Sequence, residues 1–149
     1  MFQEQLLLYL ADDDETDRTF FQEAFDTIIS DINVISFDNG VTLMDNLLNE
    51  NNPLPQAIYL DLNMPLMNGI ECLSDIKNEI KLQNIPIFIY SSTIDSSVID
   101  QLQNNGANLY LVKPNSFDRL VSTLRHSLDY LESYCNKKIV LFDKFIVNN

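Results

Sequence analysis

Basic residues are scarce in this chain. Nine Lys and Arg stand against 22 Asp and Glu among 149 residues, which gives a formal net charge of −13. No stretch carries the clustered basic residues with which proteins hold the phosphates of DNA or RNA, so the sequence argues against nucleic acid as a partner. The acidity favours solubility instead, and part of it is available for a pocket that binds a cation.

Cysteines and long apolar runs are equally few. Cys72 and Cys135 have neither a metal-ligand spacing nor a CxxC spacing, and they indicate no disulfide framework. Cys72 lies in an apolar helical pattern and is expected to be buried. No run is long enough to span a membrane, and the N-terminus lacks the basic flank and apolar stretch of a signal peptide. We therefore expect a soluble, cytoplasmic protein with no membrane partner.

Short apolar runs alternate with helical patterns along the chain. The runs that predict strands are Leu6–Leu10, Asn33–Phe37, Ala57–Leu60, Ile87–Tyr90 and Leu109–Val112. The helical patterns cover Thr16–Ile29, Val41–Leu48, Ile70–Ile80, Asp95–Asn104 and Ser116–Leu131. This strict alternation predicts an α/β fold with a five-stranded, doubly wound parallel sheet, right-handed crossovers and helices on both faces.

Four of the predicted strands end in residues that handle phosphate or a metal ion. In chain order these residues are Asp12-Asp13-Asp14, Asp61, Ser91-Ser92 and Lys113-Pro114. Because the carboxyl ends of parallel strands lie along one edge of a sheet, residues that are distant in sequence converge there. Acidic groups, a hydroxyl and a Lys are the set that Mg²⁺-dependent phosphoryl transfer onto a carboxylate requires.

Each of these residue types also has a simpler explanation. Carboxylates suit Mg²⁺, but acids at the start of a helix also favour its dipole, and Asp14 and Glu15 are interpreted in that way. Asp61 is either a nucleophile toward phosphorus or the cap of a loop. The Ser91 hydroxyl bonds a phosphoryl oxygen or merely begins a loop. Lys113 would supply the positive charge that attack on a phosphoryl group needs.

Taken together, the motifs resemble the receiver domain of bacterial two-component response regulators, from about Leu6 to Leu131. Leu10-Ala11-Asp12-Asp13-Asp14 resembles the family's acidic pair, and Tyr59–Pro65 with Gly69 resembles its phospho-acceptor segment. Ser91 and Lys113-Pro114 match its hydroxyl residue and its Lys-Pro pair. The resemblance implies the flavodoxin-like (βα)5 receiver fold and a phosphorelay protein that is not an enzyme.

The resemblance also assigns roles at the acceptor. Asp61 would take a phosphoryl group from a sensor histidine kinase or a phosphotransfer protein. Asp13, Asp61 and the backbone carbonyl of Asn63 would hold Mg²⁺, with Asp12 acting largely through water.

A second group of residues would contact the phosphoryl group and respond to it. Ser91 and Lys113 would contact its oxygens, and Tyr110 would turn inward as Ser91 moves toward the phosphate. The family's output face would then lie at about Asp95–Asn104 and Asn108–Leu131, facing a downstream protein that the sequence does not name. A homodimer through that face is left open, since no explicit feature supports it.

Residues 1–134 are expected to form the receiver domain, and residues 135–149 form a tail of unknown role. The tail is too short for an output domain, so we expect a single-domain regulator that signals by protein contact. Two segments of the tail, Ile139–Phe142 and Phe145–Val147, are apolar and β-like. They would pack back on the domain or contact a partner.

Two other functions stay open. A Mg²⁺-dependent phosphohydrolase of the haloacid dehalogenase type uses acids two residues apart, as Asp12 and Asp14 are, but the chain lacks a substrate cap and the Asp61 loop would be unexplained. A receiver-like scaffold would bind partners without phosphorylation, although the residues for phosphorylation are present. Asp61-dependent phosphate uptake would exclude the scaffold, and turnover of small phosphate esters would support the hydrolase.

Overall fold

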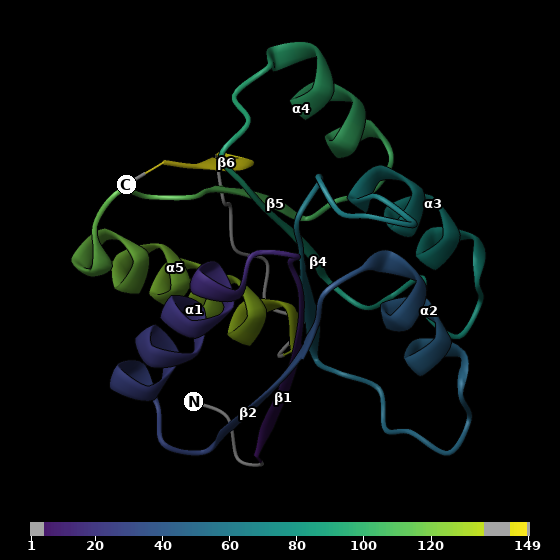
Figure 1. Cartoon of the computed structure of the whole chain (residues 1–149), viewed down its shortest axis with the longest axis horizontal. Coiled ribbons are helices and arrows are strands. Elements are labelled where there is room, and N and C mark those ends of the chain that lie inside the picture. The colour runs from purple at the N-terminus through teal and green to yellow at the C-terminus, as the bar shows by residue number, and fades with distance from the viewer. Residues whose placement is uncertain (1–4, 136–143, 149) are drawn as a thin grey trace.

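The computed structural model describes residues 5–135 and 144–148, in which strands and helices alternate (Figure 1). The strands are β1 (Leu6–Ala11), β2 (Ile32–Phe37), β3 (Ala57–Leu60), β4 (Ile87–Ser91), β5 (Leu109–Val112) and β6 (Ile146–Val147). The helices are α1 (Glu15–Ile28), α2 (Gly40–Leu48), α3 (Gly69–Asn78), α4 (Ser96–Asn104) and α5 (Phe117–Cys135). The predicted alternation is therefore confirmed.

All the strands run parallel in one sheet with the order β2-β1-β3-β4-β5-β6. The first five follow the 2-1-3-4-5 order of flavodoxin-like folds. The register pairs Ala11 with Leu60 and Ser91 with Val112, so neighbouring strands end nearly level. The residues that follow β1, β3, β4 and β5 consequently share one edge of the sheet.

Helices cover both faces of this sheet (Figure 1). On one face α2, α3 and α4 bury residues such as Leu43, Leu73 and Leu102, and on the other face α1 and α5 bury residues such as Phe21 and Leu124. Strands covered on both sides need apolar residues at consecutive positions, which explains the continuous apolar runs of the sequence. The expected burial of Cys72 is confirmed in the first of these cores.

Two expectations about apolar helix faces were wrong. The apolar spacing within Thr16–Ile29 predicts that Phe20 lies in the core with Phe21 and Phe25, but Phe20 is 49% exposed, because Phe21 and Phe25, one turn apart, form the buried face of α1. The apolar spacing within Ile70–Ile80 predicts that Ile80 ends the helix on its buried face, but α3 ends at Asn78 and Ile80 is 83% exposed. The buried face of α1 therefore begins at Phe21, and the last buried residue of α3 is Ile76.

The tail contributes β6, which pairs with Tyr110 and Leu111 of β5. Val147 is buried in the core beneath α1 and α5, so this part of the tail packs back on the domain. The other β-like segment, Ile139–Phe142, lies outside the described residues. Among the helices that are described, none is long and apolar enough to cross a membrane.

Candidate functional site

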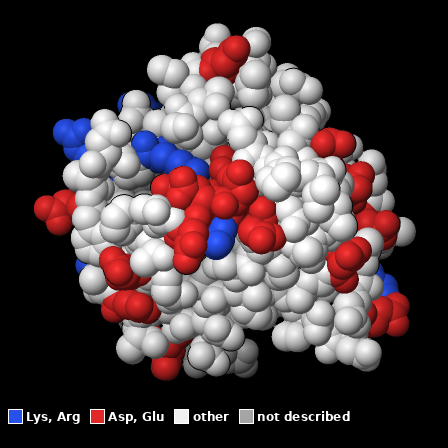
Figure 2. All heavy atoms as spheres, viewed as in Figure 1, with Lys and Arg blue, Asp and Glu red and all other residues white. Residues whose placement is uncertain are grey.

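The polar residues predicted at the strand ends meet at one place. One carboxylate oxygen from each of Asp12, Asp13 and Asp61 lies within 4.8 Å of the other two. Figure 2 shows acidic side chains gathered at the centre of one face, with basic atoms among them. The edge of the sheet thus brings together two acids that follow β1 and one that follows β3.

Lys113, which follows β5, is bonded to three carboxylates. Its Nζ lies 2.8 Å from Asp12 Oδ2, 2.8 Å from Asp17 Oδ2 and 3.3 Å from Asp61 Oδ2. The ammonium group also sits over the Tyr90 ring, 5.1 Å from its centroid. Burial by itself would lower the pKa of Lys113, but hydrogen bonds to Asp12 and Asp17 and the charge of Asp61 raise that pKa above its usual value. Lys113 therefore stays positively charged.

Asp12 is the deepest acid of the site. Its side chain is fully buried, Oδ1 accepts the Asp14 N–H at 3.0 Å, and Oδ2 accepts from Lys113. Burial raises the pKa of Asp12 to about 6, and the bond from Lys113 limits that rise. Asp13, by contrast, is exposed. The two neighbouring acids thus face different surroundings.

Asp61 is held by the chain that follows it. Its Oδ1 accepts the Leu62 N–H at 2.8 Å, and the Gly69 N–H donates to the Leu62 carbonyl at 3.0 Å. A Cβ on Gly69 would lie 2.2 Å from the Asp61 carbonyl oxygen, so only glycine permits this close approach. The side chain of Asn68 caps α3 directly before Gly69. The loop from β3 to α3 is therefore fixed against the backbone of Asp61.

Ser91 and Tyr110 meet the loop between β4 and α4 at the same residue, Thr93. The Thr93 N–H donates to Ser91 Oγ at 3.2 Å, and the Tyr110 hydroxyl donates to the Thr93 carbonyl at 2.5 Å. Both Ser91 and Tyr110 are buried. The two residues assigned to the switch are thus linked through one loop residue.

The structure adds one residue and leaves one prediction open. Asp17, in the first turn of α1, was not predicted as part of the site although its carboxylate binds Lys113. The helix dipole already explains an acid in the first turn of a helix, so no specific signal in the sequence indicated Asp17 as part of the site. Asn63 is exposed in the loop after Asp61, and its carbonyl as a metal ligand stays a prediction.

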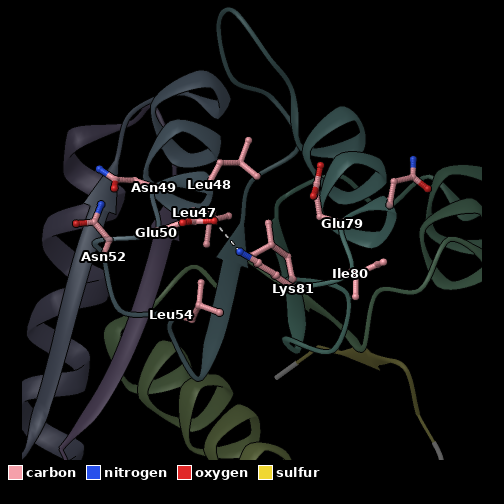
Figure 3. A pocket seen from close by; sticks show the side chains of 11 residues that line it. Leu47, Leu48, Asn49, Glu50, Asn52, Leu54, Glu79, Ile80 and Lys81 are labelled. Atoms are coloured by element: carbon pink, nitrogen blue, oxygen red, sulfur yellow. Dashed lines mark hydrogen bonds and ion pairs between the residues drawn. The ribbon is translucent and has the colours of Figure 1, made fainter.

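A pocket of about 500 Å³ lies away from this cluster, where α2 and α3 end (Figure 3). Leu48, Leu54 and Ile80 are among its lining residues, and an ion pair between Lys81 and Glu50, 2.8 Å long, joins its two sides. Helices that follow parallel strands end at the opposite edge of the sheet from the strand ends. The pocket contains none of the predicted site residues, so the acidic edge is the candidate site.

Solved structures with a similar fold include two cyanobacterial proteins. The phosphorylated phytochrome response regulator RcpA matches with a TM-score of 0.80 at 26% identity, over 87% of this chain and 95% of RcpA. The Mn²⁺-bound form of the response regulator Rcp1 matches with a TM-score of 0.75 at 26% identity, over 91% of this chain and 98% of that one.

Sequence relatives agree with this likeness. The probable methanogenesis regulatory protein FilR2 of Methanothrix harundinacea is 27% identical over 131 residues, 86% of this chain and 84% of FilR2. Rcp1 of Synechocystis sp. is 29% identical over 118 residues, 76% of this chain and 80% of Rcp1. A segment of the sensor histidine kinase CheAY of Helicobacter pylori, 15% of that protein, is 26% identical to 82% of this chain.

The family described as the response regulator receiver domain, which is not classed among enzymes, matches residues 8–125. That range contains the acidic triad, Ser91, Tyr110 and Lys113. Receiver domains act together with histidine kinases in two-component signalling. By its sequence, its strand order and its acidic pocket with an adjacent Lys, the chain belongs to the response regulator receiver domain family.

Proposed function

We propose that this receiver domain accepts a phosphoryl group on Asp61 from a histidine kinase or a phosphotransfer protein, and then changes its contacts with a downstream protein. The observation that carries the proposal is the convergence of three carboxylates with the Lys113 ammonium group at one edge of the sheet. A carboxylate approaches a phosphoryl group only where positive charge offsets their mutual repulsion. Lys113 supplies one such charge beside Asp61.

A divalent cation fits the acidic triad. Three carboxylate oxygens within 4.8 Å repel one another, and hard oxygen donors are the ligands that Mg²⁺ prefers. Asp13, Asp61 and the Asn63 carbonyl would hold the ion, with Asp12 acting largely through water. The bound ion would supply further positive charge to the phosphoryl oxygens. The Mn²⁺-bound structure of Rcp1, a similar protein, supports this proposal.

The transfer makes one bond and breaks one. An Asp61 carboxylate oxygen bonds to phosphorus while the bond from phosphorus to the imidazole nitrogen of the donor breaks and its electron pair stays on that nitrogen. Because the other ring nitrogen carries a proton, the products are an aspartyl phosphate and a neutral histidine. Lys113 and the hydroxyl of Ser91 would then bond the phosphoryl oxygens. The movement of Ser91 would reach Tyr110 through Thr93, because each of those residues already bonds Thr93.

The surface beside Lys113 suits a protein donor. A cleft of about 270 Å³ opens there, and its lining includes Asp17, Phe20 and Phe117. Phe20 and Phe117 are exposed, which is unusual for large aromatic rings. Exposed aromatic side chains around a reactive group provide the apolar contact that a docking protein needs.

The test is the intact mass of the full chain after incubation with acetyl phosphate, with and without Mg²⁺, for the wild type and Asp61→Asn. The proposal expects one added phosphoryl group that requires both Mg²⁺ and Asp61. Undiminished labelling of a folded Asp61→Asn variant would refute the assignment of the acceptor.

If the wild type shows no adduct, beryllofluoride binding in the presence of Mg²⁺ distinguishes the remaining explanations. A stable complex that depends on Asp61 would indicate a working acceptor with rapid dephosphorylation. No complex would favour a scaffold that acts without phosphorylation, and repeated turnover of small phosphate esters would support the hydrolase.

A further inference from the structure

The outer edge of β5 carries the chain's own tail. The Tyr110 N–H donates to the Phe145 carbonyl at 2.9 Å, and Ile146 and Val147 pair with Tyr110 and Leu111. The Phe145 and Tyr110 rings are in contact, with centroids 6.3 Å apart. Residues 145–147 thus lie directly on the residue assigned to the switch.

A continuous series of contacts joins this tail to the candidate site. Phe145 contacts Tyr110, the Tyr110 hydroxyl bonds the Thr93 carbonyl, and the Thr93 N–H bonds Ser91 Oγ. Ser91 ends β4, the neighbour of the strand that Asp61 follows. Because Tyr110 is fully buried, its ring cannot change orientation without a change in what packs around it.

The tail segment matches the edge it occupies. Val147 is 3% exposed and fills the core beneath α1 and α5, whereas Phe145 packs against the opposite core, beside Tyr110. An extended segment added to a sheet edge gains main-chain hydrogen bonds, and its side chains fill pockets on the two faces. A strand of two residues gains little free energy from these contacts, so its docking is readily shifted.

We propose that the outer edge of β5 is a binding site for an extended segment, that residues 145–147 are its ligand, and that its occupancy is coupled to phosphorylation of Asp61. This inference rests on the proposed function. Docking of the tail keeps Tyr110 buried and bonded to Thr93, and a phosphoryl group that draws Ser91 inward favours the same arrangement. Docking and phosphorylation therefore stabilise each other, and linkage requires the two effects to be equal.

The Tyr110 amide reports docking directly, because its hydrogen-bond acceptor belongs to the tail. Hydrogen exchange of this amide is measured by NMR on the full chain, with Mg²⁺ alone and with Mg²⁺ plus beryllofluoride. Exchange is expected to slow by about fivefold or more, the lower range of measured coupling between sites. The Asn108 amide, which lies directly before β5 and bonds the Ile87 carbonyl, is the control.

The reciprocal experiment measures beryllofluoride affinity. Phe145→Ala is expected to weaken that affinity by the factor found in the exchange experiment, whereas Ile146→Ala, which trims a partly exposed side chain in the same segment, is expected to change it less than twofold. Saturable beryllofluoride binding with unchanged Tyr110 exchange, or wild-type affinity in Phe145→Ala, would overturn the coupling alone. Absence of any beryllofluoride binding would overturn the proposed function, and the coupling with it.

Discussion

The Lys113 ammonium group forms ion pairs with Asp12 and Asp17. Both carboxylates lie at the same distance from Nζ, and both are closer to it than Asp61 is. Asp17→Asn is expected to speed phosphorylation by acetyl phosphate by about fivefold, because removing one nearby charge changes the energy of an anionic donor by about 1 kcal/mol. Asp26→Asn makes the same charge change at an exposed position of α1 and serves as the control. Equal rates in the two variants would contradict this role for Asp17.

Asp12 makes the stability of the metal-free protein depend on pH. Burial raises its folded-state pKa from 3.8 to about 6, so the folded protein holds this proton more tightly than the unfolded chain does. The free energy of unfolding is therefore expected to fall as the pH rises from about 4 to about 6, by at most about 3 kcal/mol. Denaturant unfolding in EDTA measures this, and a decline that is equally large in Asp12→Asn would exclude Asp12 as its source.

The acids and the Lys of the site were predictable because each directly follows an apolar strand run. Asp17 was not, since an acid in the first turn of a helix is already explained by the helix dipole. The sequence also could not predict that Asp12 is buried while Asp13 is exposed. Two adjacent residues after a strand point to different sides, and only the packed structure determines which of them is buried.

At the scale of elements, the start of α3 fixes the acceptor loop. Gly69→Ala is expected to lower the free energy of unfolding by about 2 kcal/mol or more, because the added Cβ would meet the Asp61 backbone. Urea unfolding measures the loss. Ser74→Ala, at an exposed position of the same helix, should stay within about 0.5 kcal/mol of the wild type. A Gly69→Ala variant as stable as Ser74→Ala would show that the loop relaxes without cost.

A second prediction at the scale of elements concerns Phe20, on the exposed face of α1. Phe20→Ala is expected to slow transfer from a phosphorylated histidine kinase by about tenfold while leaving the rate with acetyl phosphate unchanged, because only the protein donor needs the aromatic contact. Ile80→Ala removes an apolar side chain that is even more exposed than Phe20, near the opposite edge of the sheet, and is the control. Equal slowing with both donors would indicate damage to the site and not to docking.

The sequence predicted each of the five strands to within one residue at either end, because β1, β3, β4 and β5 are buried on both faces and need continuous apolar runs, whereas β2 alternates apolar and polar residues. The sixth strand was predicted only as a β-like segment, since two residues carry no periodicity of their own. The end of α3 was missed for a related reason. Ile80 continues the apolar spacing of the helix, but the backbone leaves the helix after Asn78.

Over the whole molecule, the excess of acidic residues acts against the folded state. With a net charge of −13, compaction brings like charges together, and added salt screens them. Raising the ionic strength from low to physiological levels is expected to stabilise the metal-free protein by about 1 kcal/mol, or about 2–4 °C in Tm. Scanning calorimetry in NaCl and in choline chloride should give equal shifts; a shift with one salt only would indicate specific ion binding.

The position of β6 also bears on how the molecule behaves among its own copies. A parallel sheet with an open edge offers unpaired N–H and C=O groups to any other extended chain, which is the usual starting point of aggregation. Here the tail covers the β5 edge at Tyr110 and Leu111, and it does so with a strand too short to form a long new edge. Ile146 and Val147, which pair with Tyr110 and Leu111, thus also shield the sheet from unwanted strand pairing.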